Sequence, residues 1–167
     1  ELSKRLTVRD GVELAYDVFR PFAPGEKFPA LLSWSPYTRQ LQQTPSPLGQ
    51  NEAGLTEFWV PRGYGQVIAD VRGSNDSTGA WDHWGPKEQK DLAEMIEYIA
   101  GLPWCNGKVG MVGCSYFGMS QLLGAEQQPE GLTAIFPYDA MTDLYRDAYY
   151  HGGIYSAWGR FWFSSLM

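Results

Sequence analysis

The sequence predicts an α/β domain with a mostly parallel sheet, helices on both faces and an antiparallel hairpin at the amino end. Short apolar segments of strand length alternate with segments of helical periodicity, which is typical of a parallel sheet covered by helices. The first two apolar segments are separated by Asp10-Gly11, a tight-turn sequence. The chain has 167 residues, of which 44% are hydrophobic, and this is enough for one domain with a single core.

The amino-terminal part of the chain predicts three strands and two loops. Apolar and polar residues alternate over 6–8 and over 12–18, so the turn between them makes a strand hairpin. A loop with three prolines covers 21–29, and the apolar run 28–34 has the length of a buried strand. Residues 40–54 are rich in Gln, Pro and Gly, and we expect them to form a surface excursion.

The middle of the chain alternates between helix and strand. The predicted elements are a short helix over 55–59, a strand over 66–71, a helix over 86–100, a strand over 108–112, a helix over 119–126 and a strand over 132–136. The helix over 86–100 is the clearest, because Leu92, Met95, Ile96 and Ile99 repeat at helical spacing and Gly101 follows its end.

Aromatic residues are concentrated near the carboxyl end. Residues 136–163 hold 10 of the 25 aromatic side chains: Phe136, Tyr138, Tyr145, Tyr149, Tyr150, Tyr155, Trp158, Phe161, Trp162 and Phe163. Large exposed apolar patches are rare on monomers. We therefore expect the architecture to continue beyond this segment, and we expect the segment to mediate association if it is left uncovered.

The charge balance argues against a nucleic-acid partner. The chain has 13 Lys and Arg against 19 Asp and Glu, a net charge of −6, whereas phosphate backbones are bound by an excess of basic side chains. No apolar run reaches the roughly 18 residues that a membrane helix needs. We expect a soluble protein with no nucleic-acid or membrane partner. The first residue is Glu1 rather than Met, so the compartment stays open, with the cytoplasm favoured.

The sequence predicts neither a metal site nor a cofactor site. Cys105 and Cys114 are too few for a zinc cluster, and we expect two reduced or buried thiols. A phosphate-binding loop needs Lys and then Ser or Thr after its second glycine, but Gly118 is followed by Met119-Ser120. The dinucleotide fingerprint G-x-G-x-x-G is absent from the sequence as well.

The segment that carries chemistry is Gly113-Cys114-Ser115-Tyr116-Phe117-Gly118, between a predicted strand and a predicted helix. A serine at such a junction lies on a sharp elbow that exposes its hydroxyl above the strand ends. Glycines at the two ends of the segment remove side chains that would crowd the turn. The usual pattern is G-x-S-x-G, whereas here the second glycine comes one place later. Ser115 is therefore the candidate nucleophile.

Further short motifs are spread along almost the whole chain: Arg9-Asp10-Gly11-Val12-Glu13-Leu14, Arg20-Pro21, Ser35-Pro36-Tyr37, Asp70-Val71-Arg72-Gly73, Trp104 to Gly110, Asp143-Leu144-Tyr145 and Gly152-Gly153. In this order they resemble the cocaine esterase and X-Pro dipeptidyl-peptidase-like serine hydrolases, which include the α-amino acid ester hydrolases. The elbow of that family, G-x-S-Y-x-G, accounts for the displaced glycine.

The resemblance implies an α/β-hydrolase fold and a division of the chain. Residues 1–150 would form the amino-terminal part of the catalytic domain, and residues 151–167 would begin a helical cap region. The chain is expected to stop before the rest of the cap and before a carboxyl-terminal β domain.

The resemblance also implies roles for three residues. Ser115 would attack an ester or amide carbonyl and form an acyl-enzyme that water hydrolyses. The Tyr37 hydroxyl and the Tyr116 backbone N–H would form the oxyanion hole. The family usually has glycine where this chain has Asn75, and we expect no consequence because Asn tolerates the left-handed conformation.

The general base and the acid of a catalytic triad are not evident. Hydrolases of this fold place the acid and the histidine after the nucleophile, but His83 precedes Ser115. His151 follows Ser115, with three aspartates between them, yet this stretch has no strand of its own to place an imidazole over the nucleophile. The triad Asp and His are therefore expected outside this chain.

Three functional interpretations stay open. The first is a serine hydrolase that cleaves a carboxylic ester, an amide or an X-Pro peptide bond of a small substrate. The second is a non-catalytic α/β-hydrolase-like binding or interaction module that keeps the elbow as a structural turn. The third is a segment of a longer enzyme, with chemistry completed by residues outside the chain.

Overall fold

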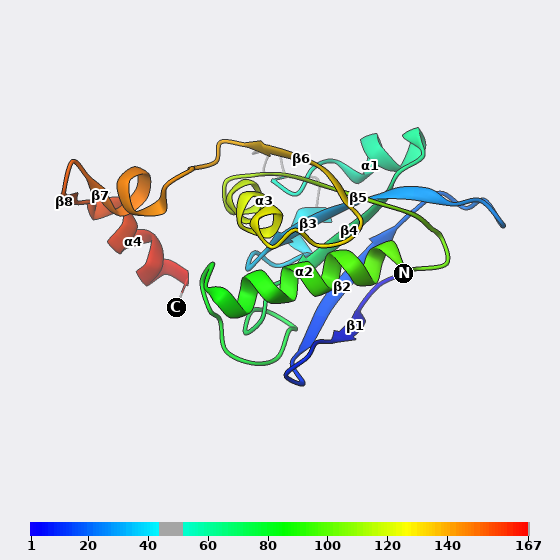
Figure 1. The fold of residues 1–167 in the computed structure, drawn as a ribbon, viewed down its shortest axis with the longest axis horizontal. Helices are drawn as coiled ribbons and strands as arrows, with labels where there is room; N and C mark the ends of the chain where they lie inside the picture. The colour runs from blue at the N-terminus through cyan, green and yellow to red at the C-terminus, as the bar shows by residue number, and fades with distance from the viewer. Residues whose placement is uncertain (44–51, 167) are drawn as a thin grey trace.

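The computed structural model describes residues 1–43 and 52–166. These residues form one six-stranded sheet with helices packed against it and a carboxyl-terminal arm beside it (Figure 1). Residues 44–51 of the predicted surface excursion lie outside the described residues, which include residues 40–43, with the short helix η1 (Leu41–Gln43), and residues 52–54 of that stretch.

The sheet has the predicted mixture of parallel and antiparallel strands. Its strands in chain order are β1 (Lys4–Thr7), β2 (Glu13–Phe19), β3 (Phe28–Ser35), β4 (Gly65–Asp70), β5 (Cys105–Cys114) and β6 (Leu132–Tyr138). Their order in space is β1-β2-β4-β3-β5-β6. The strands β4, β3, β5 and β6 are parallel, whereas β1 and β2 pair antiparallel with their neighbours.

The opening hairpin forms as its turn sequence predicts. Leu6 of β1 pairs with Leu14 of β2, and the Val8 N–H donates to the Val12 carbonyl at 2.9 Å. Gly11 has a φ of 82°, a left-handed value that glycine adopts without steric cost. The hairpin therefore adds the antiparallel edge of the sheet.

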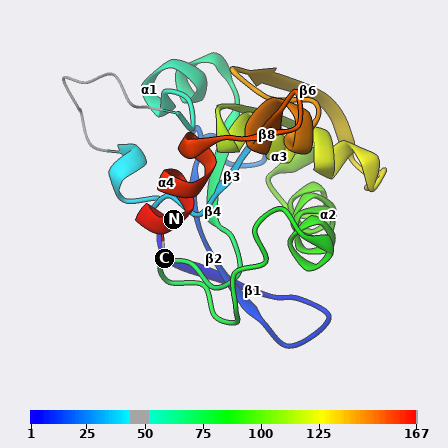
Figure 2. The ribbon, with the colours of Figure 1, turned by 90° about the vertical axis from the view of Figure 1, so that its left-hand side faces the viewer.

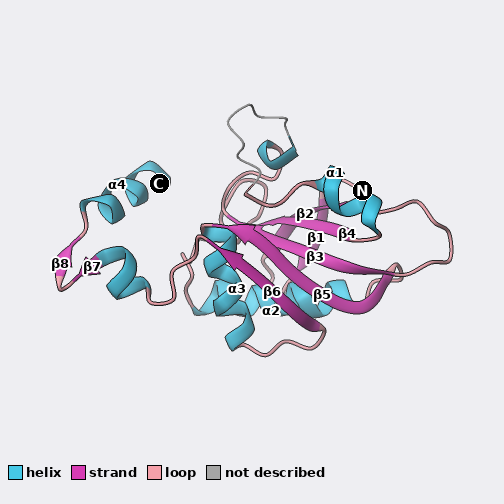
Figure 3. Cartoon of the chain, turned by 90° about the horizontal axis from the view of Figure 1, so that it is seen from above, coloured by secondary structure: helices cyan, strands magenta, loops and turns pink. Residues whose placement is uncertain are grey.

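Helices lie on both faces of the sheet (Figure 3). The long helix α2 (Pro86–Ala100) and the helix α3 (Tyr116–Glu126) cover one face, and α1 (Thr56–Trp59), with the short turn η2 (Val60–Arg62), lies at the other. The helix α3 begins three residues earlier than the sequence predicts, because the Ser115 elbow leads directly into its first turn. The strand β5 is longer than expected, because Gly107 and Gly113 lie within it.

The core lies between the sheet and α2. Leu92, Met95, Ile96 and Ile99 are at most 1% exposed, which confirms the predicted apolar stripe of the helix. They pack in one cluster with apolar residues of β3 such as Trp34, which is 0% exposed. The carboxyl ends of β3 and β5 are thereby held beside each other, and the residues that follow these ends form the candidate site.

The carboxyl-terminal arm leaves the sheet after β6. It contains a turn of π-helix, η3 (Tyr145–Tyr149), two short paired strands, β7 (Tyr150–His151) and β8 (Ile154–Tyr155), and the helix α4 (Ala157–Leu166). Figure 2 shows α4 in front of the carboxyl ends of the sheet strands. Within the described residues, no helix combines the length and the apolar character that a membrane crossing needs.

Candidate functional site

Ser115 lies on a sharp elbow between the end of β5 and the start of α3. Its φ of 58° and ψ of −120° are unusual for a residue with a side chain. Such strain costs about 1–3 kcal/mol and persists only where the surroundings enforce it. Three backbone hydrogen bonds hold the turn: the Ser115 N–H donates to the Tyr138 carbonyl at 3.3 Å, and the Gly118 and Met119 N–H groups donate to the Ser115 carbonyl.

The two glycines of the elbow are required by close contacts. A Cβ atom at Gly113, where φ is 147°, would lie 2.3 Å from the Phe117 Cβ. A Cβ atom at Gly118 would lie 2.8 Å from the Tyr138 carbonyl oxygen. The second glycine is needed at 118 because this residue, rather than 117, passes against the end of β6. Phe117 points into a small cluster with Ala53 and is 0% exposed.

Tyr37 lies beside the nucleophile. It follows the carboxyl end of β3, the strand next to β5, and its hydroxyl lies close enough to the Ser115 and Trp162 side chains for both to lower its pKa. Burial raises the pKa of Tyr37 to about 12, and the charge of Glu52 acts in the same direction. The phenol is therefore protonated at neutral pH and able to donate a hydrogen bond.

Two polar side chains hold the Tyr37 segment in place. The Tyr37 N–H donates to Ser35 Oγ at 3.0 Å, and Asn75 Nδ2 donates to the Pro36 carbonyl at 2.8 Å. Asn75 has a φ of 46°, so it adopts the left-handed conformation that its place in the loop predicts. Its amide gives it a function that glycine could not supply.

A buried cluster of ion pairs also holds the segment around Tyr37 in place. Arg39, 0% exposed, pairs with the carboxylates of Asp70 and Asp17, also buried, and of the more exposed Asp76. The Coulomb attraction of buried pairs is only weakly screened by solvent. The cluster therefore ties the residues after β3 to the end of β4.

The Tyr116 side chain points away from the solvent, beneath the elbow. Its hydroxyl donates to both oxygens of Glu88, at 2.8 and 2.9 Å, and accepts a hydrogen bond from Trp81 Nε1 at 3.3 Å. Its ring stacks on Trp84 at 4.4 Å between centroids. The predicted contribution of Tyr116 is its backbone N–H, and this side chain fixes the residue that carries it.

The sequence analysis missed Glu88, although the pattern of α2 contains a signal for it. Glu88 precedes Leu92 by four positions and Met95 by seven, so it lies on the apolar stripe of the helix. It is 2% exposed. A carboxylate on a buried stripe needs polar partners, and these are what the structure shows.

The two histidines are not placed as a general base for Ser115. His83 packs against the rings of Trp81, Trp84 and Trp162, and burial lowers its pKa to about 4, far below the range of an efficient base at neutral pH. His151 is exposed in β7, and its ring bonds to the carbonyl of residue 147.

The remaining polar groups near the elbow do not form a metal site. Cys114 Sγ lies 3.7 Å from Asp139 Oδ2, and burial and the charge of Asp139 raise the pKa of this thiol. Within the described residues, no group of three or more His, Cys, Asp or Glu is arranged to hold a metal ion. Cys105 and Cys114 are both free, as predicted.

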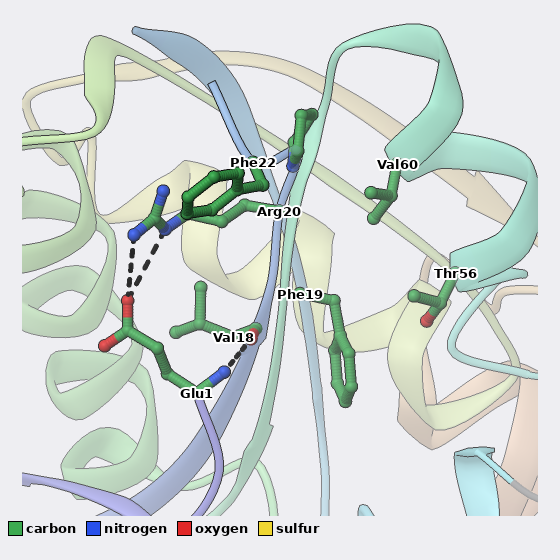
Figure 4. A pocket seen from close by; sticks show the side chains of 8 residues that line it. Glu1, Val18, Phe19, Arg20, Phe22, Thr56 and Val60 are labelled. Carbon is green, nitrogen blue, oxygen red and sulfur yellow. Dashed lines mark hydrogen bonds and ion pairs between the residues drawn. The ribbon is translucent and has the colours of Figure 1, made fainter. Parts of the chain in front are cut away.

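A separate hollow of about 380 Å³ lies beside β2 and α1 (Figure 4). In Figure 4 the Arg20 guanidinium pairs with the Glu1 carboxylate at 3.3 Å. Phe19 in its wall pairs with Gln66 near the beginning of β4, so the hollow is at the edge where the parallel strands begin. Ser115 follows the opposite edge, and the hollow is therefore not part of its site.

Comparisons with known proteins agree with this geometry. The pattern of the X-Pro dipeptidyl-peptidase (S15) family matches residues 10–167. The chain is 39% identical over 147 residues to a cocaine esterase of Rhodococcus, covering 87% of this chain and 24% of that protein. It is 28% identical over 139 residues to a Xaa-Pro dipeptidyl-peptidase of Lactobacillus delbrueckii, covering 74% and 18%.

A solved structure shows the same fold. The crystal structure of a CocE/NonD family hydrolase from Staphylococcus aureus aligns with a TM-score of 0.91 and 31% identity, covering 99% of this chain and 32% of that one. The chain spans only 24% and 18% of the length of the two curated relatives named above. With its elbow, strand order and motifs, it belongs to the S15 family of X-Pro dipeptidyl-peptidases, within the α/β-hydrolase fold.

Proposed function

We propose that the full-length protein is a serine hydrolase that cleaves carboxylic ester or amide bonds, including X-Pro peptide bonds, through an acyl-enzyme on Ser115. The observation that carries this proposal is the Ser115 residue, held on a strained elbow beside a protonated Tyr37 phenol. Backbone strain at a polar residue is found mainly at functional sites.

The chemistry follows from this geometry. Ser115 Oγ attacks the substrate carbonyl carbon, and the carbonyl oxygen gains the negative charge of a tetrahedral intermediate. The Tyr37 hydroxyl and the Tyr116 N–H donate to that oxygen and stabilise a charge absent from the ground state. Collapse of the intermediate expels the alcohol or amine, and water then attacks the ester carbonyl of the acyl-enzyme to release the acid and free Ser115.

The proton of Ser115 passes to a histidine outside this chain, oriented by an aspartate that is also outside it, and from that histidine to the leaving alcohol or amine. His83 is unsuitable because of its low pKa, and His151 lies out on the arm. We further propose that residues 151–167 belong to a helical cap region, because α4 brings Trp162 to the Tyr37 hydroxyl. Residues 1–150 then form the amino-terminal part of the catalytic domain.

A fluorophosphonate, which labels activated serines, tests the proposal. The full-length protein is expected to be labelled and to hydrolyse a p-nitrophenyl ester, and Ser115→Ala is expected to lose both, with kcat falling on the order of a million-fold. Ser120→Ala is the matched control. Ser120 is a buried serine of α3, the helix that follows Ser115, and its hydroxyl donates to the Trp34 carbonyl. Labelling that persists in Ser115→Ala, or no labelling of the full-length protein, would refute the proposal; the latter would favour a non-catalytic binding module.

A further inference from the structure

Glu88 is a buried carboxylate whose partners are neutral hydrogen-bond donors. It is 2% exposed in the first turn of α2. Its oxygens accept from the Tyr116 hydroxyl, from the Trp84 N–H at 3.0 Å and from Trp34 Nε1 at 3.3 Å. Burying a carboxylate is costly unless donors satisfy it, and here three donors do so. An apolar residue at this place would leave these donors unpaired, so the acceptor oxygens of Glu88 hold the groups that donate to them.

Tyr116 is the one partner of Glu88 that belongs to the elbow. It is the first residue of α3, directly after the strained Ser115. The first N–H groups of a helix have no acceptor within the helix, and none of the hydrogen bonds among the described residues uses the Tyr116 N–H. This donor is therefore available to an oxyanion beside Ser115.

The direction of that N–H depends on how residue 116 is held. The peptide between Ser115 and Tyr116 is in a conformation that the chain does not favour by itself, so neighbouring contacts must impose it. The Tyr116 side chain supplies them: it is 0% exposed, it stacks on Trp84, and its hydroxyl is held by Glu88 and Trp81. Among these contacts, the bond to Glu88 is charge-assisted when the carboxylate is ionised, and such bonds are the strongest type.

We propose that Glu88 is a positioning residue of the oxyanion hole: by holding the Tyr116 phenol it aims the Tyr116 backbone N–H at the oxygen that becomes negative. This inference rests on the proposed function, because it assumes that Ser115 attacks a carbonyl. Glu88 itself does not touch the substrate. Its contribution is expected only in the transition state, when the oxyanion forms.

The test uses Glu88→Gln and Tyr116→Phe, singly and together, in the full-length protein. Gln keeps the shape of Glu but presents an amide donor where three donors converge, and Phe keeps the stacked ring but removes the hydroxyl. The measurements are kcat and KM for a p-nitrophenyl ester and the inhibition constant of a boronic acid, which mimics the tetrahedral state. Glu97→Gln is the matched control, because Glu97 is exposed on the same helix.

Glu88→Gln is expected to lower kcat by about 10-fold to 100-fold, the range for loss of a supporting residue behind a functional group. KM should change little, and the boronic acid should bind more weakly by the same factor as kcat/KM falls. Tyr116→Phe should act in the same direction, and the double variant should be no worse than the more impaired single variant, because both break one contact. Glu88→Asp, which keeps the charge, should recover part of the rate.

Other outcomes overturn the inference. A Glu88→Gln enzyme with unchanged kcat and boronic acid affinity, or with losses that add to those of Tyr116→Phe, shows that Glu88 does not act through Tyr116. A fall in kcat that only matches a fall in the fraction of protein labelled by fluorophosphonate shows a structural role alone. In these cases the proposed function survives, since Ser115 is still labelled. If the wild-type protein is not labelled, both proposals fail together.

Discussion

The elbow and the carboxyl-terminal arm are held in different ways. Around Ser115, each group is fixed by buried neighbours: Tyr37 by the loop after β3, and Tyr116 by Glu88 and Trp84. The arm over 139–166 packs against the core through Ala140, Met141, Leu144 and Trp162. The Trp162 ring stacks on Trp84 at 5.8 Å, and the arm lies to one side of the sheet (Figure 1). Several of its large side chains are exposed: Tyr145, Ile154, Tyr155, Trp158 and Phe161.

This difference bears on the proposed mechanism. The elbow region, which would supply the nucleophile and the oxyanion donors, rests on a core formed by β3, β4, β5 and α2. The arm exposes apolar surface of the kind that a partner or a further segment covers. Substitutions in the elbow region should therefore have large effects, whereas matched substitutions in the arm should have small ones.

The sharpest contrast concerns two arginine ion pairs. Arg39→Met removes a buried guanidinium and leaves Asp70 with its charge uncompensated, and we expect the free energy of unfolding to fall by about 3–5 kcal/mol. Arg146→Met removes an exposed pair with Asp143 in the arm and should have no measurable effect. Thermal and urea unfolding of the two variants measures the contrast. Equal losses would show that the arm is as firmly held as the elbow.

Tyr37→Phe tests the oxyanion hole directly. The variant loses the hydroxyl beside Ser115 but keeps the ring, which packs edge-on against Phe117 at 6.0 Å. We expect the barrier to rise by about 2.7–4 kcal/mol, which lowers kcat by orders of magnitude without a change in melting temperature. The exposed phenol of the arm is the control: Tyr145→Phe should leave kcat unchanged. Near-full activity of Tyr37→Phe would remove its hydroxyl from the mechanism.

The stability of the elbow should depend on pH through Glu88. Burial raises the pKa of Glu88 to about 7, from 4.5 for the ordinary side chain, and the charge of Asp82 acts in the same direction. The folded protein therefore holds a proton at this site between these two pH values, whereas the unfolded chain does not. The Glu88 contribution is present below pH 4.5 and is lost as the pH rises to about 7, by at most about 3 kcal/mol.

Melting temperatures of wild type and Glu88→Gln across this pH range measure that dependence. The stability of wild type relative to the variant should fall from pH 4.5 to 7 and then level off. Glu97→Gln, the exposed control, should follow the wild-type curve. A difference that instead grows with pH would mean that the donors of Tyr116, Trp84 and Trp34 outweigh the cost of burying the charge.

Substitutions in the arm are expected to have the smallest effect on the free energy of unfolding. Their effect is therefore measured on self-association of the chain. The 167-residue chain expressed alone is predicted to associate through its exposed aromatic side chains. Phe161→Ser, at a side chain that is 74% exposed, should reduce this association without lowering the melting temperature. Phe22→Ser, at a 94% exposed side chain outside the arm, is the control. A monodisperse chain in light scattering would contradict the prediction.

Local patterns predicted much of the fold. The hairpin at Asp10-Gly11, the apolar stripe of α2 and the alternation of strands and helices depend on residues near one another in sequence, and the structure confirms them. The ends of β5 and α3 were less well predicted. Glycine usually marks an element boundary, but here close packing at Gly113 and Gly118 requires it inside these elements.

The sequence by itself determined the succession of strands and helices and the antiparallel hairpin, through alternating patterns, and its motifs marked Ser115, Tyr37 and Tyr116 as candidates. Only the tertiary structure brought Tyr37 beside Ser115 and placed the Glu88 carboxylate under Tyr116. These contacts join residues separated by 78 and 28 positions in the sequence. Their geometry depends on how β3, β5 and α2 pack together, and long-range packing of this kind leaves no periodic signal in a single sequence.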